Sequence, residues 1–114
     1  MFELTLNSKD GIAVAATKGN LDETAREPCR EKLHPLVGER GTRLIIDLAG
    51  SERVNSAGIG NLVALTADAN TNGSRVVICN LRPYVSMVIS VTKLDKFFNL
   101  VADLDAAARW CKAE

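Results

Sequence analysis

The sequence predicts one α/β domain with a mixed sheet, in which an N-terminal β-hairpin is followed by alternating helices and strands and the helices pack on the sheet. Apolar and polar residues alternate over 2–7, as in a half-buried strand. Two short apolar runs, 44–48 and 76–79, are typical of interior strands covered on both faces. Elsewhere apolar residues recur at helical spacing. The chain has 114 residues, 46% of them hydrophobic, which fits a single domain over 1–114.

The N-terminal third is predicted to form the hairpin and then an interrupted helix. A turn at 8–11 joins the first strand to a second strand over 12–17. A helix is expected over 22–37. Pro28 suits an early turn of that helix, where its missing N–H costs little. Pro35 should kink or finish the helix.

The remaining elements follow from helical stripes and stop signals. The pair at 72–73 should end the central helix, and Pro83 should lie near the start of the next one. A short edge strand is expected over 97–101. Asp103 can cap a last helix that runs through Trp110. The buried stripes of the central helix and its successor are expected to be Ile59, Leu62, Val63 and Ala67, and Val85, Val88 and Ile89.

Composition excludes several function classes. Fourteen basic residues balance fourteen acidic ones, so no net positive field would recruit nucleic acid or an anionic membrane. No apolar run reaches membrane-spanning length, and the N-terminus lacks the basic and apolar regions of a secretory signal. We therefore expect a cytoplasmic protein that does not insert into a membrane.

The three cysteines predict neither a disulfide nor a metal site. Cys29, Cys79 and Cys111 are odd in number, and no pair has the spacing of a zinc knuckle. We expect reduced thiols, as in a cytoplasmic protein. Cys79 should belong to the core, whereas Cys111, near the C-terminus, should be exposed.

The loop after the first buried run carries the main candidate site. The residues 55–60, Asn-Ser-Ala-Gly-Ile-Gly, place the Ser56 hydroxyl at a helix N-terminus, where free N–H groups and the helix dipole favour an anion. A phosphate on Ser56 would add a charge of about −1.5 to −2 at pH 7. A binding surface controlled by phosphorylation is therefore favoured over catalysis, with a plain helix cap as the alternative.

Other chemistries fit the sequence poorly. Val63 stands where a dinucleotide loop needs its third glycine, and a serine hydrolase would lack a nucleophile elbow and have only His34 as a base. We expect no enzyme and no cofactor, with His34 at the surface or in packing. Asp47 either caps the serine loop or belongs to a binding rim. Arg53 and Arg82 are expected to be solvated, and pairing with a phosphate is the alternative.

Five segments in this order resemble the STAS domain, the fold of the bacterial anti-sigma factor antagonists. The turn at 19–22 is similar to the family's glycine-acid-aliphatic-aspartate turn, and 44–48 to its central strand. The stretch 54–60 resembles the family signature, usually Asp-Ser followed by Ser or Ala and Gly. The residues at 80–83 and 92–98 resemble its third helix and the following turn. The resemblance covers nearly the whole chain.

The resemblance implies partner switching. An antagonist of this family binds an anti-sigma factor, usually a serine kinase, and the sigma factor is released. The kinase then phosphorylates the signature serine, which ends the complex, and a serine phosphatase resets it. Carried onto this chain, Ser56 is the phosphoacceptor. The implied partner-binding residues are Asn20, Asp22, Asn55, Ala57, Gly58, Ile59, Gly60 and Asn61.

Two positions depart from the family pattern. Asn20 and Asn55 stand where the family usually has acids. Asn55 can still cap a helix, and a lost carboxylate reduces repulsion against a phosphate on Ser56 while removing a group that a kinase could read. A second hypothesis is therefore a constitutive subunit or scaffold of a membrane transport ATPase or signalling complex, without phosphorylation. A nucleotide or ligand sensor is a third. Monomer and weak dimer both stay open.

Overall fold

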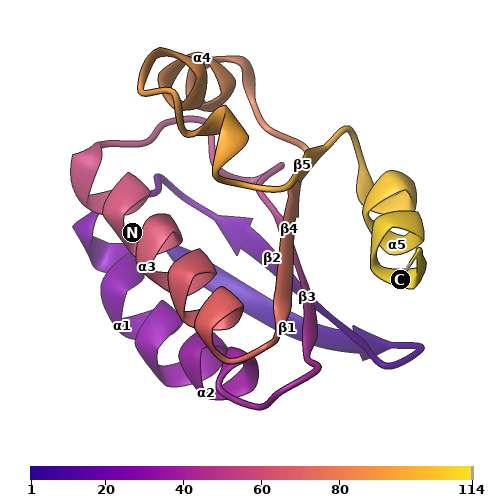
Figure 1. Cartoon of the computed structure of the whole chain (residues 1–114). Coiled ribbons are helices and arrows are strands. Elements are labelled where there is room, and N and C mark those ends of the chain that lie inside the picture. Colours follow the sequence, from indigo (N-terminus) through magenta and orange to yellow (C-terminus); the bar gives the residue numbers. More distant parts are fainter. Residues whose placement is uncertain (114) are drawn as a thin grey trace.

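A five-stranded mixed sheet runs through the middle of the molecule, with its strands in sequence order (Figure 1). The computed structural model describes residues 1–113. β1 and β2 pair antiparallel, as the predicted hairpin requires, and β2 to β5 run parallel. The strands are β1 Glu3–Lys9, β2 Ile12–Lys18, β3 Arg43–Asp47, β4 Arg75–Cys79 and β5 Leu100–Val101.

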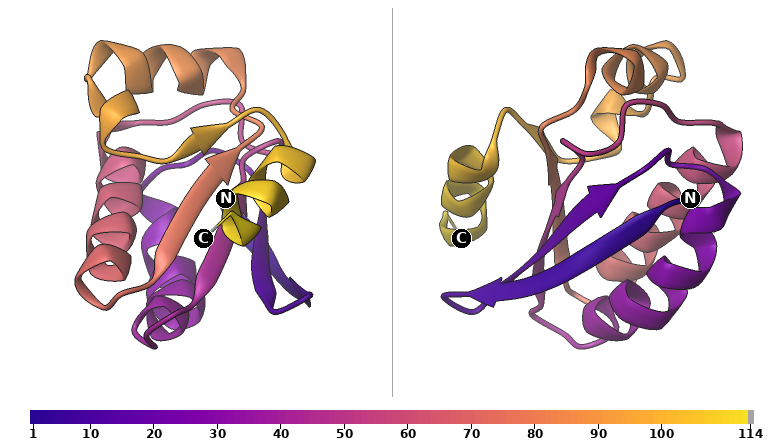
Figure 2. Two further views of the ribbon diagram at one scale, coloured as in Figure 1. Left: turned by 45° about the vertical axis from the view of Figure 1, so that its right-hand side comes forward. Right: turned by 180° about the vertical axis from the view of Figure 1, so that it is seen from behind.

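Helices cover both faces of this sheet. The helical elements η1, α1, η2, α2 and α3 lie on one face, α5 lies on the other, and α4 sits at the end of the sheet (Figure 2). None of the helices in 1–113 has the length and apolar character that crossing a membrane would require. The helical elements are η1 Glu23–Ala25, α1 Arg26–Pro28, η2 Cys29–Leu33, α2 His34–Val37, α3 Ser56–Thr71, α4 Pro83–Val91, η3 Leu94–Lys96 and α5 Leu104–Lys112.

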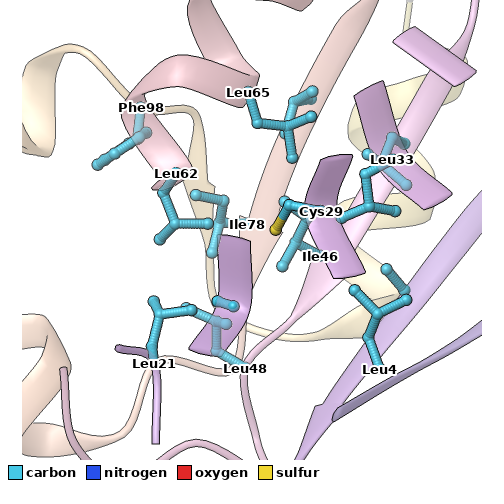
Figure 3. Close-up of a cluster of buried hydrophobic side chains, with 14 of the residues drawn as sticks. Leu4, Leu21, Cys29, Leu33, Ile46, Leu48, Leu62, Leu65, Ile78 and Phe98 are labelled. Carbon is cyan, nitrogen blue, oxygen red and sulfur yellow. The ribbon is translucent and has the colours of Figure 1, made fainter. Parts of the chain in front are cut away.

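The two interior strands send side chains into two separate apolar cores. Leu44 and Ile46 of β3 belong to the larger core beneath α3, shown in Figure 3 with Leu62, Leu65 and other buried side chains. Ile45, between them, belongs to a smaller core beneath α5. β4 alternates in the same way. Both strands are therefore covered on both faces, which confirms the prediction made from their continuous apolar runs.

The first long helix is interrupted at its second proline. The His34 N–H donates to the Cys29 carbonyl, five residues back, so the turn before Pro35 is a π-turn. Pro35 has no N–H to donate, and its ring crowds the carbonyl four residues before it, which a wider turn relieves. Pro35 thus deforms the helix without ending it. His34 Nδ1 lies 2.8 Å from Asp68 Oδ2, which ties α2 to α3.

Three expectations are wrong in detail. Cys111 is buried, because α5 turns Ala107 and Cys111, four residues apart, into the smaller core. Ala67 is exposed, and Leu65 joins Leu62 in the buried stripe of α3 instead. The edge strand near the C-terminus is β5 alone, much shorter than 97–101.

We predict that replacing two buried threonines with valine changes the free energy of unfolding in opposite directions. Within residues 1–113 the Thr66 hydroxyl is buried without a hydrogen-bond partner. The Thr17 hydroxyl lies 2.8 Å from that of Ser51 and donates to the Asp47 carbonyl at 3.1 Å. Thr66→Val should raise the free energy of unfolding by about 1 kcal/mol, and Thr17→Val should lower it by about 1–3 kcal/mol. Urea titration measures both, and equal losses would contradict this account.

Folding should weaken at alkaline pH because buried thiols keep their protons. Burial raises the pKa of Cys29 from 9.0 to about 11, and burial with the Asp47 and Asp103 carboxylates raises that of Cys79 to about 12. An unfolded chain ionises these thiols first, so their contribution is complete below about pH 9 and lost through pH 11–12. Urea midpoints should fall more steeply from pH 9 to 11 in the wild type than in a Cys29→Ala/Cys79→Ala variant.

Candidate functional site

The start of α3 is capped by Asn55 and not by the neighbouring serine. Asn55 has extended backbone angles, and its Oδ1 accepts a hydrogen bond from the Gly58 N–H at 2.9 Å. The Ile59 N–H donates to the Asn55 carbonyl at 3.0 Å. The expectation that Asn55 can cap is confirmed. The alternative that Ser56 is only a helix cap is wrong, because Ser56 is the first residue inside the helix.

Ser56 therefore has a free hydroxyl. Its side chain is exposed, and within the described part of the chain Oγ makes no hydrogen bond. The backbone N–H groups of Ser56 and Ala57 also have no acceptor among residues 1–113. They lie at the positive end of a 16-residue helix. The site can thus hold an anion at Ser56 without breaking an existing interaction.

The serine loop is held in place by the turn that follows β2. The Gly19 N–H donates to the Gly50 carbonyl at 3.0 Å, and the Leu21 N–H donates to that of Arg53 at 2.9 Å. The Asn55 N–H returns a bond to the Leu21 carbonyl at 3.1 Å. These bonds extend the pairing of the sheet beyond its strands. The 19–22 turn and the serine loop, which were predicted to share one surface, lie side by side.

Two residues assigned to the partner surface lie underneath it. Gly58 and Ile59 are buried. A Cβ on Gly58 would lie 1.9 Å from the Leu21 carbonyl oxygen, so the missing side chain admits this chain's own backbone and not a partner's. A Cβ on Gly60 would meet nothing within 4 Å, so this glycine does leave open space. Gly58 and Ile59 shape the site from below.

The polar residues beside Ser56 form a network that the sequence did not reveal. Asn55 Nδ2 donates to Glu23 Oε1 at 3.2 Å, and Asn61 Nδ2 donates to the Asp22 carbonyl at 3.4 Å. An aspartate at position 55 would instead face the Glu23 carboxylate. The hydroxyl and N–H of Thr24 hold the pKa of the Asp22 carboxyl below its ordinary value, so Asp22 is ionised.

The other charged candidates act at the rim of the loop. Asp47 Oδ1 accepts hydrogen bonds from the Ala49 N–H and from Asn80, each at 3.0 Å, so Asp47 caps the loop. The Arg82 guanidinium lies 3.4 Å from the Ala49 carbonyl and 3.9 Å from Glu52. The Arg53 guanidinium lies 5.2 Å from the centre of the Tyr84 ring. Among residues 1–113, neither arginine makes a hydrogen bond, ion pair or ring contact with Ser56.

A hollow lies between the 19–22 turn, the serine loop and the start of α4. Asn20, Asp22, Arg53, Asn55 and Tyr84 are among its lining residues. Tyr84 and Glu23 were not anticipated, because each reaches the site only through tertiary packing. In the described part of the chain no three His, Cys, Asp or Glu side chains are grouped to hold a metal ion.

The family model of the STAS domain matches residues 3–107. The chain belongs to the STAS domain family. BtrV of Bordetella bronchiseptica, named as a candidate anti-sigma factor antagonist, is 24% identical over 107 residues, which cover 94% of this chain and 92% of BtrV.

Solved structures show the same fold at low identity. A variant of RsbS from Moorella thermoacetica, with glutamate in place of a serine, matches with a TM-score of 0.81, 22% identity and coverage of 96% of this chain and 95% of that one. The anti-sigma factor antagonist SpoIIAA in its unphosphorylated form matches with a TM-score of 0.77, 17% identity and 98% coverage of both chains. Phosphorylated SpoIIAA of Bacillus matches with a TM-score of 0.68 and 18% identity, and the match covers 94% of this chain and 98% of that one.

These matches confirm the predicted fold of the STAS domain. Its signature, 54–60, is the loop end and first turn of α3, and its acid-bearing turn, 19–22, is the segment bonded to that loop. The signature therefore also fixes the start of α3 against the 19–22 turn, besides forming part of the surface. Its glycine at position 58 receives the Leu21 carbonyl, and its residue at position 55 caps the helix.

The two signature glycines give a matched pair of variants. Gly58→Ala should lower the free energy of unfolding by about 1–3 kcal/mol, because the new Cβ pushes the Leu21 backbone away from α3. Gly60→Ala should raise it by about 0.5–1 kcal/mol, because alanine favours the helix and the space is open. Thermal and urea unfolding measure both. A neutral Gly58→Ala would show that the Leu21 contact does not fix the start of α3.

Proposed function

We propose that this STAS domain is an anti-sigma factor antagonist, a protein-binding module without enzyme activity. It binds an anti-sigma factor of the serine-kinase type, frees the sigma factor for transcription, and is switched off when Ser56 is phosphorylated. One observation carries the proposal: at the N-terminus of α3 the Ser56 hydroxyl is exposed and makes no hydrogen bond to any residue in 1–113. The anti-sigma factor antagonists among its relatives and structural neighbours support it.

A phosphate on Ser56 would be tolerated by the chain itself. The helix is already capped by Asn55, so modifying the hydroxyl removes no bond of the fold. The free N–H groups of Ser56 and Ala57 and the helix dipole favour the anion. The switch would then act on binding and leave the fold intact.

A phosphate on Ser56 would instead weaken binding of the partner. A dianion pressed into an interface loses hydration, and it repels any acidic group that faces it. About 2.8 kcal/mol of such cost weakens binding about a hundredfold. The proposed contact surface is the accessible part of the site, which comprises the exposed Asn20, Asn55, Ala57 and Gly60 and the half-buried Asp22 and Asn61. A serine phosphatase resets the switch.

The second candidate is a constitutive subunit or scaffold of a membrane transport ATPase or signalling complex. Asn55 favours it, because the side chain at that signature position is occupied with the cap and with Glu23. In that function Ser56 stays unmodified. Phosphopeptide mapping of the chain from its native cells across growth conditions distinguishes the two candidates. A phosphate on Ser56 in a variable fraction supports the switch, and an unmodified Ser56 at full coverage contradicts it.

Substitutions at Ser56 test the switch directly. Ser56→Ala should keep the partner bound in the presence of ATP, whereas Ser56→Asp should weaken binding at least tenfold, because it places a carboxylate at the interface. Ser8→Asp is the matched control, since Ser8 is exposed at the hairpin end of β1. Calorimetry with the purified partner measures each affinity. Equal affinities of the wild type and Ser56→Asp would refute the proposal.

A further inference from the structure

The helix α4 is apolar on two sides but covered on one. Its nine residues include no charged side chain. Val85 and Ile89 are buried, whereas Tyr84, Met87 and Val91 are 40%, 51% and 73% exposed. The exposed three follow at helical spacing and form one face, which we call the α4 stripe. The apolar face of α4 is therefore wider than the part of it that the core covers.

The α4 stripe continues the surface around Ser56. Figures 1 and 2 show α4 at the same end of the sheet as the start of α3, above the loop that leads from β3 into α3. Tyr84 lines the hollow beside Asn20 and Asn55, and its ring packs against Arg53 of the serine loop. A partner that covers Ser56 from this side therefore reaches the stripe without crossing an intervening element.

The rim of the stripe is mainly basic. Arg53 and Arg82 lie at its N-terminal end, and Lys93 and Lys96 follow its C-terminal end, with only two acids among them, Glu52 and Asp95. The basic excess is confined to the flanks of the stripe, because Asp22 and Glu23 lie on the Ser56 side of the hollow. Such a rim fits a partner whose apolar contact is bordered by acidic groups.

We infer that the α4 stripe is a second half of the partner surface and holds an apolar, acid-bordered element of the kinase that Ser56 switches. This inference rests on the proposed function. The three side chains expose about 300 Å², at about 200 Å² for a fully exposed large side chain. A stable interface takes about 800 Å² from each partner. The stripe alone is thus too small for a stable dimer of this chain, and it suits a shared surface with the serine loop.

Site-specific cross-linking in the native cells tests which molecule covers the stripe. The photoreactive amino acid p-benzoylphenylalanine replaces Ala57, Met87 or Leu104 in the full chain. Leu104 is the control, because it is 40% exposed on α5, on the other side of the sheet. Positions 57 and 87 should capture the same polypeptide, and position 104 should not.

Each other outcome of the cross-linking overturns the inference. A second copy of the chain, a different polypeptide or no product at position 87 contradicts it. The proposed function fails separately, if position 57 captures no protein or if Ser56→Asp leaves the product of position 57 unchanged. The two failures can therefore be told apart.

Charge substitutions on the stripe then measure its contribution with the purified partner. Val91→Glu should weaken binding at least tenfold and Val91→Lys by less, because a carboxylate faces acidic groups and an ammonium does not. Leu104→Glu should change nothing. Val91 and Leu104 are both exposed, so the unfolding midpoints of the three variants should stay close to that of the wild type. Wild-type affinity in Val91→Glu, or a greater loss in Val91→Lys, refutes the inference.

Discussion

The backbone contact between Leu21 and the first turn of α3 is the constraint on which the site depends. The Leu21 N–H and carbonyl bond to Arg53 and Asn55, and the same carbonyl fills the space that a side chain on Gly58 would take. This contact fixes the serine loop against the end of β2, and so fixes where α3 begins. A loop anchored at both its strand and its helix end can present Ser56 in one position, which lowers the ordering cost when a partner binds.

The different roles of Asn55 and Ser56 follow from this contact, because it fixes the residue at which α3 begins. Because Asn55 caps the helix, Ser56 is left with an unused hydroxyl in the first turn. Asn55 also donates to Glu23, which an aspartate could not do. Asparagine at this position therefore suits the Glu23 carboxylate beside it better than an aspartate would. It also keeps one carboxylate fewer beside the position where a phosphate would add its charge.

Sequence patterns predicted the elements that depend on neighbouring residues. They failed for contacts between segments that are distant in sequence. The apolar run 44–48 predicted an interior strand, and Asp103 predicted a cap, because each depends on neighbours in sequence. Gly58 was assigned to the partner surface but is covered by Leu21, and only the fold brings the two together. Cys111 was misjudged from its terminal position, although its spacing from Ala107 would have placed both on one helix face. Tyr84 reaches the site from another helix, and nothing near it in sequence signals that.

The separation of the α4 stripe from Ser56 has a physical advantage for a reversible switch. Apolar contacts bind in either phosphorylation state, so they supply affinity without sensing the phosphate. A phosphate at the edge of the same interface acts by charge and desolvation, and these need no movement of the fold. Arg53 lies between the two, with its guanidinium on the Tyr84 ring and its carbonyl bonded to Leu21. One half of the surface can thus supply affinity in both states, while a phosphate on the other half lowers the affinity of the whole interface.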